Sequence, residues 1–531
     1  MELVGGNLIG GASSAESGVR FRATDPSTGE ALAPEFTEAS VAEVDRAVAE
    51  AERAFEIYGR TTPLERATFL RAIADELVAL GAVLLERAHA ETALPIARLE
   101  GERGRTVGQL RLFADYLEEG SWVEARIDTG DASRTPLPKP DLRRMLVPLG
   151  PVAVFGASNF PLAFSVPGGD TASALAAGCT VVCKAHPAHP GTSELCAGAI
   201  TRAAAANGLP AGVFSLLHGW SHDVGLAMVR HPLTRAVGFT GSLRGGRALC
   251  DAAAARAEPI PVYAEMGSVN PVFLLPSAAA ARAEQLAQGL AMSITAGVGQ
   301  FCTNPGVIVG VRGDAMDSVT QQLTVRMAAA DPGIMLYEQL GSGYSRAVER
   351  ARSHGADLLA PSSGETAPRR SRPVLLRVDA SKFAEDPELR EEMFGPVSIV
   401  VEARDSAELE RVAESMEGQL TATIHGTDEE LRDHARLVAI LQRKVGRLLF
   451  NGYPTGVEVG HAIQHGGPYP ASSDSRSTSV GSSAITRFAR PVCYQGFPDA
   501  ALPAQLRNAN AGGIWRLVNG DLTRADVTAS A

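Results

Sequence analysis

The fold is decided by residues 151–239, in which four short apolar runs, PVAVF (151–155), TVVC (180–183), VFSLL (213–217) and RAVGF (235–239), alternate with Ala-rich segments. Short apolar runs of this kind are typical of buried strands, and the segments at 170–177, 192–206 and 242–256 are expected to be helices. Strands that are separated by helices of about 10–15 residues need right-handed crossover connections, which give a parallel sheet. The region therefore predicts an α/β lobe.

The segments on both sides of this region also show the periodic patterns of helices and strands. On the N-terminal side, residues 40–120 are expected to be helical, since Val44, Ala47 and Ala51 follow the 3.6-residue period. On the C-terminal side, a second alternating series from about 262 to 450, with strands expected near 306–311, 397–401 and 447–451, predicts a second α/β lobe. Residues 121–150 contain Pro136, Pro138 and Pro140 and are expected to form an extended excursion between elements.

Composition limits the class of protein. A chain of 531 residues is too long for one compact core, so two or three lobes are expected. The net charge of −11 argues against a nucleic-acid partner, although a local site can still take an anionic substrate. The sequence contains no stretch of about 18 apolar residues and its first residues do not resemble a signal peptide, so neither a membrane nor export is expected. The six cysteines form no CxxC pair, and a reducing cytoplasm is the expected location.

Two residues are candidates for covalent chemistry. Cys302 lies in GQFCT (299–303), on a loop after the helical run 279–297. Most lone cysteines are buried and inert, but a loop at the end of an element can also stabilise a nucleophilic thiolate. Glu265 ends the apolar stretch VYAE (262–265) and is either solvated or held beside a cleft. In the second case, apolar neighbours would raise its pKa and fit it to take a proton from water.

Two further candidates follow strands of the parallel series. Asn159, in FGASNFP (155–161), is either a turn residue or an amide that donates to a developing oxyanion. Lys184 ends the run VVCK, and because the chain has only four lysines, a lysine at an apolar strand end calls for a specific reason. The carboxyl ends of parallel strands are where α/β sheets bind ligands, so both residues are candidates for such a site.

Two loops carry groups suited to a nucleotide. FTGSLRGG (239–246) joins a strand to a helix through Gly241, Ser242 and Gly246, so that free backbone N–H groups would face a pyrophosphate. A plain turn is the alternative. EEMFGP (391–396) places Glu392 and Phe394 before a Gly-Pro turn, where a carboxylate could accept the two hydroxyls of a ribose, although such acidic pairs are usually just solvated.

The order and spacing of these motifs resemble those of the aldehyde dehydrogenase superfamily, from about residue 20 to residue 495. Within it the chain looks most like the α-ketoglutaric semialdehyde (2,5-dioxopentanoate) dehydrogenases, through FGASNFPLAF (155–164), KAHPAHPGTSEL (184–195), GGPYP (466–470) and VGSSAITRFARPVCYQ (480–495). The resemblance implies an α/β aldehyde dehydrogenase fold with a Rossmann-like coenzyme-binding domain at 1–123 and 148–264. It also implies an α/β catalytic domain at 265–480, and a β-arm for oligomerisation with the C-terminal tail at 124–147 and 481–531.

The resemblance also assigns roles. Cys302 attacks the aldehyde carbon, and Asn159 and the Cys302 backbone N–H hold the oxyanion. Hydride passes to the nicotinamide, which leaves a thioester, and Glu265 activates the water that hydrolyses it. Lys184 binds ribose or phosphate at the adenine end, and Glu392 binds the nicotinamide ribose. The residues expected to bind the coenzyme are therefore Lys184, Gly241, Ser242, Gly246, Glu392 and Phe394.

The sequence departs from the superfamily pattern in two places. Many members carry a lysine in the helix after the asparagine, where it serves proton relay, but this stretch is SVPGGD (165–170), which leaves the proton route open. NAD-preferring members often place a glutamate three residues after the lysine, and here that residue is Pro187. Losing that acid removes repulsion against a 2′-phosphate, so NADP is the expected coenzyme, with NAD possible.

The substrate is expected to be a small aldehyde, with α-ketoglutaric semialdehyde the first choice. Its remote carboxylate needs a cation, and GRTVGQLR (104–111) places Arg105 and Gln109 one helical turn apart on one face. By resemblance this helix lies near the substrate entrance. Arg105 could equally be solvated or form an interdomain salt bridge, in which case Phe160, Phe164 or the loop 452–470 would set specificity.

Alternative functions were weighed against this one. A cysteine hydrolase is disfavoured because no histidine has a recognisable catalytic setting, and the adjacent side chains of SHD (221–223) diverge. His461 and His465 have the i, i+4 spacing of a helical zinc site but lie among glycine and proline, so no metal is expected. A CoA-acylating enzyme would lack Glu265. An NADP-dependent enzyme for fatty or other aldehydes and a catalytically silent structural relative are the remaining alternatives.

A homodimer or homotetramer is expected, joined through 124–147 and the strand near 486–495.

Overall fold

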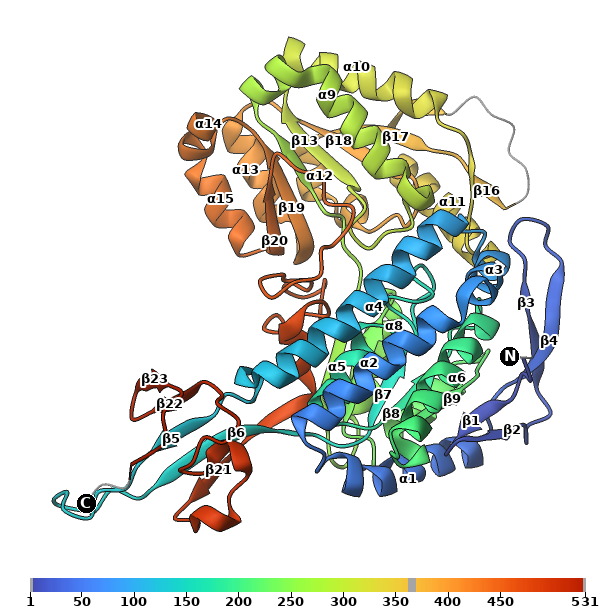
Figure 1. Cartoon of the computed structure of the whole chain (residues 1–531). Helices are drawn as coiled ribbons and strands as arrows, with labels where there is room; N and C mark the ends of the chain where they lie inside the picture. Colours follow the sequence, from blue (N-terminus) through green and yellow to red (C-terminus); the bar gives the residue numbers. More distant parts are fainter. Residues whose placement is uncertain (1–2, 362–368, 529–531) are drawn as a thin grey trace.

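The structure, a computed structural model, describes residues 3–361 and 369–528 and consists of two lobes and a projecting sheet (Figure 1). The first lobe contains a seven-stranded sheet in the order β11-β10-β7-β8-β9-β1-β2. Five neighbouring strands are parallel, as predicted, and four of these are the predicted runs: β7 (Val152–Phe155), β8 (Val181–Lys184), β9 (Phe214–Leu217) and β10 (Ala236–Thr240). The fifth, β11 (Val262–Glu265), ends at Glu265.

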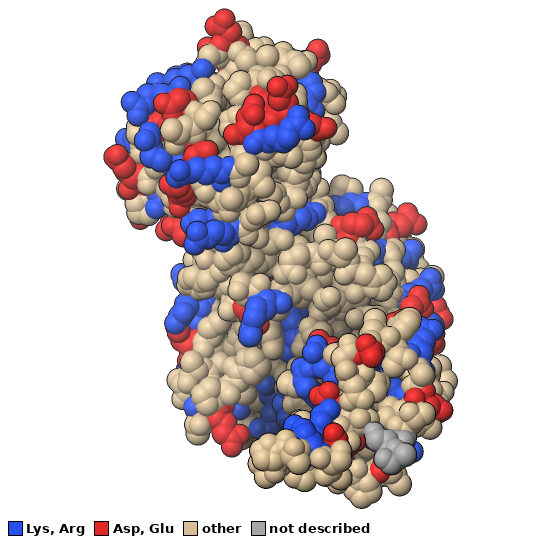
Figure 2. Space-filling view, turned by 90° about the vertical axis from the view of Figure 1, so that its left-hand side faces the viewer, with Lys and Arg blue, Asp and Glu red and all other residues tan. Residues whose placement is uncertain are grey.

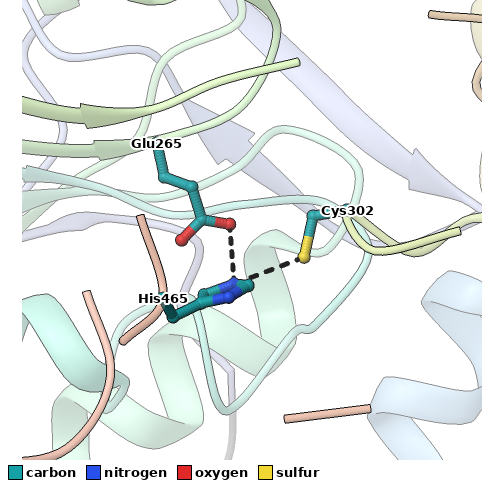
Figure 3. Close-up of side chains that lie close together, drawn as sticks. All are labelled: Glu265, Cys302 and His465. Atoms are coloured by element: carbon teal, nitrogen blue, oxygen red, sulfur yellow. Dashed lines mark hydrogen bonds and ion pairs between the residues drawn. The ribbon is translucent and has the colours of Figure 1, made fainter. Parts of the chain in front are cut away.

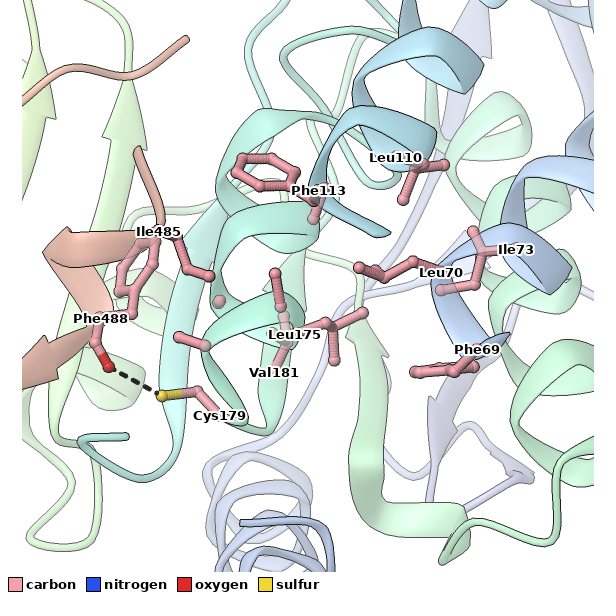
Figure 4. Packing of buried hydrophobic residues seen from close by; sticks show 14 of the residues in the cluster. Phe69, Leu70, Ile73, Leu110, Phe113, Leu175, Cys179, Val181, Ile485 and Phe488 are labelled. Carbon is pink, nitrogen blue, oxygen red and sulfur yellow. Dashed lines mark hydrogen bonds between the residues drawn. The ribbon is translucent and has the colours of Figure 1, made fainter. Parts of the chain in front are cut away.

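Both faces of this sheet are covered by helices because alternate side chains of each strand are apolar. Val152 and Val154 of β7 belong to one core cluster and Ala153 and Phe155 to another on the opposite face. The first cluster packs against α2 (Pro63–Ala79), α4 (Ile96–Glu119), α5 (Gly169–Ala177) and α6 (Pro190–Ala206), as Figure 4 shows in part. The second packs against α1 (Val41–Tyr58), α7 (Asp223–Arg230) and α8 (Leu243–Ala254). The predicted helices at 40–120, 170–177, 192–206 and 242–256 are therefore confirmed.

The second lobe contains another seven-stranded sheet, in the order β15-β17-β18-β13-β12-β19-β20, in which only the edge strand β15 (Asp357–Pro361) pairs antiparallel. The predicted strands are β13 (Val307–Val311), β18 (Val397–Ala403) and β20 (Val445–Phe450). The others are β12 (Val272–Leu274), β17 (Val374–Asp379) and β19 (Gln419–His425). The long helix before Cys302 is α9 (Pro276–Thr295). The lobe also contains α10 (Asp314–Ala329), α11 (Glu338–Ser353), α12 (Ala380–Glu385), α13 (Ser406–Ser415), α14 (Asp428–Asp433) and α15 (Ala435–Gln442).

Residues before 40 contain strands that the sequence analysis did not identify. β1 (Asn7–Ile9) and β2 (Ala12–Ser14) extend the first sheet antiparallel, and β3 (Arg20–Thr24) pairs with β4 (Ala31–Thr37) in a separate hairpin. Three-residue strands are too short to show an alternating pattern, and β3 and β4 are largely exposed. Their positions are set by pairing with the rest of the chain and not by local sequence.

The excursion at 121–150 forms a β-sheet that projects away from both lobes (Figure 1). β6 (Leu142–Pro148) pairs with β5 (Arg126–Asp128) on one side and along seven residues with β21 (Ala489–Gln495) on the other, and β22 (Arg516–Val518) and β23 (Asp521–Thr523) complete the sheet. Large apolar side chains are exposed here: Leu137, Phe497 and Leu522 are 69%, 50% and 66% exposed.

The lobes meet at a narrower waist, and charged side chains of both signs are interspersed over the face seen in Figure 2. After β20 the chain crosses back to the first lobe. Ser473 and Ala264 exchange hydrogen bonds there, so residues 471–473 lie along the outer edge of β11 although the predicted catalytic domain ran to 480. Among the described residues, no helix has the length and hydropathy needed to cross a membrane.

Candidate active site

The loop that carries Cys302 is held in an uncommon backbone conformation. Gly297, Val298 and Gly299 have φ values of 53°, 60° and 65°, which is a left-handed region that a β-branched residue such as Val298 rarely adopts. At Gly299 a Cβ atom would collide with the carbonyl group of Gly395, so only glycine fits. The motifs around Cys302 and Gly395, about 90 residues apart in sequence, therefore lie in direct contact.

Three side-chain amides fix the loop from different elements. Asn159 donates from Nδ2 to the carbonyl oxygen of Gln300 at 3.0 Å. Asn270 donates to the carbonyl oxygens of Cys302 and Asn304, both at 2.9 Å, and Asn304 donates to that of Gly395 at 3.2 Å. Asn159 thus lies beside the nucleophile loop, as its predicted role at the oxyanion requires.

Cys302 forms a cluster with Glu265 and His465 (Figure 3). Sγ of Cys302 lies 3.5 Å from Nε2 of His465, and the same Nε2 lies 3.0 Å from Oε1 of Glu265. The other carboxylate oxygen of Glu265 accepts the hydroxyl of Ser479. Glu265 and His465 are 4% and 1% exposed, and Cys302 is half-buried. The structure brings the two predicted residues together and adds a histidine between them.

The electrostatics of this cluster differ from the prediction. The pKa of Glu265 is lowered and not raised: burial favours the neutral acid, but His465 and the Ser479 hydroxyl outweigh it by stabilising the carboxylate. Burial and the adjacent Glu265 carboxylate raise the pKa of the Cys302 thiol well above its usual value. The loop therefore holds a protonated thiol next to an ionised carboxylate, so the thiol needs a base before it can attack.

The sequence analysis considered His465 only as one half of an i, i+4 metal pair, because its place beside Cys302 depends on contacts far along the chain. It lies in the irregular segment 451–470, where its N–H donates to Oγ1 of Thr478 at 2.9 Å and its carbonyl accepts the N–H of Ser479 at 2.8 Å. His461 points elsewhere and bonds Oγ of Ser482 at 3.0 Å, so the i, i+4 pair does not form a site. The only sequence signal was the adjacent GGPYP motif.

A large cleft of about 1390 Å³ is lined by residues of both lobes. Ser242 caps α8 there by accepting the N–H of Gly245 at 3.2 Å, and the first residues of the helix, Leu243 and Arg244, are exposed. The N–H of Gly241 is not free, since it donates to the carbonyl of Glu265 at 3.0 Å. Gly246 lies against Met266, where a side chain would collide. Of the turn, Ser242 and the helix start face the cleft, whereas the two glycines serve packing, contrary to their predicted contact with a pyrophosphate.

The acidic pair before the Gly-Pro turn divides into two roles. Glu391 forms an ion pair with Arg350 at 2.8 Å. Glu392 lines the cleft close to Gly267, and burial raises its pKa to about 8. Phe394 lines a small adjoining cavity with Phe301. Glu392 is therefore the carboxyl group available to a ribose in the cleft.

Lys184 stands at the carboxyl end of β8, as predicted, but is not free. Its Nζ donates to the carbonyl of Gly219 at 2.8 Å, and burial lowers its pKa to about 8, an effect that Glu38 opposes. Glu38 itself accepts the N–H groups of Trp220 and Ser221 at 2.6 and 2.7 Å. Burial lowers the pKa of His186 well below its usual value, so His186 is neutral near pH 7 and Lys184 is the cation of the two.

The predicted substrate residues separate into an aromatic group and a buried amide. Phe164 contacts Phe160 and His465, with ring centroids 5.2 and 5.9 Å apart, and the guanidinium of Arg105 lies 4.9 Å over the Phe164 ring. Both terminal nitrogens of Arg105 are buried and have no hydrogen-bond partner within the part of the chain that the structure describes. Gln109 is instead buried against Gly169 of α5, so the predicted pairing of Gln109 with Arg105 at the substrate has no support from the structure.

Arg98 is a further residue that the sequence analysis missed. Its guanidinium lies 5.0 Å from the ring of Phe160 and 4.9 Å from that of Phe301, and it donates to the carbonyl oxygen of Asn159 at 2.9 Å. It connects the asparagine loop to the residue next to Cys302. Only its place about two turns before Arg105 on the same helix could have pointed to it.

Comparisons with known proteins agree with this arrangement. Residues 13–486 match the aldehyde dehydrogenase family. The chain is 52% identical over 523 residues to alpha-ketoglutaric semialdehyde dehydrogenase 2 of Azospirillum brasilense, covering 98% of this chain and 99% of that protein. It is 48% identical over 491 residues to alpha-ketoglutaric semialdehyde dehydrogenase of Acinetobacter baylyi, covering 92% and 93%. The structure is similar to that of an aldehyde dehydrogenase of Pseudomonas syringae in complex with NAD⁺ and octanal, with a TM-score of 0.79 and 25% identity, covering 94% of this chain and 98% of that one.

Proposed function

Because this chain belongs to the aldehyde dehydrogenase family, whose members oxidise aldehydes to carboxylic acids, we propose that its substrate is α-ketoglutaric semialdehyde (2,5-dioxopentanoate) and its product 2-oxoglutarate. The identity to two α-ketoglutaric semialdehyde dehydrogenases along nearly the whole chain supports this substrate. Within the site, the proposal is carried by the two buried terminal nitrogens of Arg105, which have no hydrogen-bond partner among the described residues, although Nε donates to the carbonyl of Val457 at 3.4 Å.

Arg105 suits the remote carboxylate of this substrate. Its two terminal nitrogens have no hydrogen-bond partner, and leaving buried donors unsatisfied costs about 1–3 kcal/mol each. A carboxylate can accept from both at once in a bidentate contact. Through Phe164, Arg105 is packed next to His465 of the catalytic cluster, so a short substrate could reach both the guanidinium and Cys302.

We assign the catalytic roles from the same geometry. Cys302 attacks the aldehyde carbon, and Asn159, held against the nucleophile loop, donates to the oxyanion together with the Cys302 backbone N–H. After hydride loss, Glu265 takes a proton from the water that hydrolyses the thioester, which its ionised state permits. An ionised carboxylate next to the thioester favours hydrolysis over transfer to CoA.

The cleft has the features that a dinucleotide requires. The capped start of α8 offers exposed backbone N–H groups for a pyrophosphate, and Glu392 faces the cleft as a ribose acceptor. The coenzyme, when bound, accepts the hydride. We propose that NADP is preferred, because Pro187 offers no carboxylate, Lys184 is charged at neutral pH, and the nearby Glu38 is occupied by backbone N–H groups.

We also propose that the chain assembles as a dimer or a dimer of dimers through the projecting sheet. Its edge strand β21 pairs with one neighbour only, and the exposed apolar side chains of Leu137, Phe497 and Leu522 lie in this arm and the adjoining tail. Exposed strand edges and apolar surface of this kind are typical of subunit interfaces.

The substrate is tested by steady-state kinetics on an aldehyde panel. We expect the highest kcat/KM for 2,5-dioxopentanoate, with lower values for succinic semialdehyde and long-chain aldehydes. Added CoA should leave the rate and the acid product unchanged. A higher kcat/KM for a long-chain aldehyde would overturn the substrate proposal, and formation of an acyl-CoA would overturn the hydrolytic one. NADP and NAD are compared in the same assays, and Pro187→Glu should lower kcat/KM for NADP more than for NAD.

A further inference from the structure

His465 has no role in the mechanism above, yet one of its ring nitrogens lies within hydrogen-bond distance of the nucleophile. Its Nε2 lies 3.5 Å from Sγ of Cys302, and Nδ1 has no hydrogen-bond partner among the described residues. A fully buried imidazole with an unpartnered nitrogen is costly unless it serves chemistry. The ring is supported on one side by Phe164 and on the other by Glu265.

We propose that His465 is a catalytic residue that takes the thiol proton of Cys302 as the sulfur attacks the aldehyde carbon, and that Glu265 stabilises the resulting imidazolium. The proposal rests on the nucleophilic role assigned to Cys302 above. In this scheme His465 accepts the proton of the Cys302 thiol, and Glu265 accepts the proton of the hydrolytic water.

The thiol needs such a base because its other neighbours disfavour its ionisation. Glu265 and Glu392 both act against a thiolate, and no lysine is present between residues 160 and 170 to relay a proton. Arg105 favours the thiolate electrostatically, but a guanidinium does not accept protons. Among these groups, the imidazole of His465 can accept a proton at a nitrogen within hydrogen-bond distance of Sγ, and the same Nε2 also faces Oε1 of Glu265 at 3.0 Å.

Glu265 is less suited to take this proton. Glu265 contacts the thiol as well, but one of its oxygens accepts the Ser479 hydroxyl and the other lies 3.0 Å from Nε2 of His465. If Glu265 accepted the thiol proton, it would be neutral when the thioester forms and could not then take a proton from water. A carboxylate that instead remains ionised attracts the protonated ring, whose new Nε2–H lies beside Oε1 of Glu265.

The proton balance of the cycle follows. The S–H bond of Cys302 breaks, an N–H bond forms at Nε2, and the sulfur forms its bond to the aldehyde carbon. To accept at Nε2, the neutral ring carries its hydrogen on Nδ1. After hydride transfer to the coenzyme, water adds to the thioester carbon and gives one proton to Glu265. The C–S bond then breaks, the sulfur recovers its proton from Nε2, and Glu265 releases its proton to solvent.

The charged groups around His465 come from several elements. On the acidic side are Glu265 at the end of β11, Glu392, and Asp170 of α5, which is paired with Arg487 at 2.7 Å. On the basic side, Arg105 of α4 and Arg447 of β20 both act on Cys302. Of these groups, Glu265 is in direct contact with His465, so its ionised carboxylate faces the ring nitrogen that receives the thiol proton.

The test is the alkylation of Cys302 by iodoacetamide, followed by mass spectrometry of its peptide in the full-length enzyme at pH 6–10. With wild type we expect alkylation at pH 7, whereas in His465→Gln it should be at least about 10-fold slower there and should approach the wild-type rate only as pH rises toward the pKa of the unassisted thiol. His461→Gln is the matched control, since His461 bonds Ser482 outside the cluster. Equal rates and equal pH profiles for His465→Gln and wild type would overturn the proposal.

A second measurement follows the pre-steady-state burst of reduced coenzyme. In His465→Gln the burst rate should fall by roughly 10²- to 10⁴-fold at pH 7, the range for a lost general base, and should recover partly at high pH. Coenzyme binding by calorimetry and circular dichroism should match wild type, and His465→Asn replaces the variant if Gln impairs folding. An unchanged burst rate overturns the proposal. The alkylation needs no aldehyde, so it separates a wrong role for His465 from a wrong substrate.

Discussion

The sharpest test of the substrate is removal of the Arg105 guanidinium by Arg105→Ala. Both of its terminal nitrogens are buried without a partner, and a carboxylate that accepts from them would form charge-assisted hydrogen bonds. Hydrogen bonds to charged groups contribute about 1.5–3 kcal/mol, and about 1.4 kcal/mol corresponds to tenfold in rate. We therefore expect kcat/KM for 2,5-dioxopentanoate to fall by roughly 10- to 100-fold. Because the contact is made in the bound substrate as well as in the transition state, most of this loss should appear as a higher KM.

The assay compares two aldehydes of equal length at saturating coenzyme, 2,5-dioxopentanoate and neutral pentanal. Pentanal has no carboxylate, so its kcat/KM should change little in Arg105→Ala. Arg111→Ala is the control, because Arg111 lies on the same helix but pairs with Asp75 on the surface at 3.0 Å. An equal loss on both aldehydes would refute the reasoning, since it would mean that Arg105 supports packing against Phe164 and does not recognise the acid.

Four further results are expected. Cys302→Ala should abolish turnover and leave coenzyme binding nearly intact, and appreciable residual activity would exclude the thioester. Glu265→Gln should give a burst of about one reduced coenzyme per site, slower than in wild type because the imidazolium loses its carboxylate, followed by slow turnover; absence of any burst would show that Glu265 itself takes the thiol proton. The pKa of Lys184 is lowered to about 8, so its charge is present below that pH and lost above it, and the Kd for NADP by calorimetry should rise through pH 8 in wild type but not in Lys184→Met; a parallel rise in both would assign the effect elsewhere. Light scattering should show a dimer or tetramer, and a stable, active monomer would contradict the role of the projecting sheet.

The sequence predicted the parts of the molecule whose positions follow from local pattern. The strands around residues 151–240 are continuous apolar runs because both faces of their sheet are buried. Such runs can be recognised from a short stretch of sequence alone. β1 and β2 could not be found in this way, since strands of three residues are defined by their partners. Gly241 and Gly246 were recognised as a turn, but whether an N–H is free or bonded depends on β11, which lies next in space.

In the active site, the sequence identified residues that carry the chemistry but did not predict their protonation states. Cys302 and Glu265 could be picked from their own neighbourhoods, because each follows an apolar element at a position where a side chain can face a cleft. Their pKa values could not, since burial and Glu265 set that of the thiol, and the main partner of Glu265 is His465, about 200 residues further along. Sequence context around Glu265 is apolar and predicts a raised pKa, whereas the tertiary contacts lower it. A buried carboxylate that stays ionised can stabilise an imidazolium. The thiol proton then has a defined acceptor in His465. The thiol can therefore remain protonated until an aldehyde is bound and become the nucleophile only at that point.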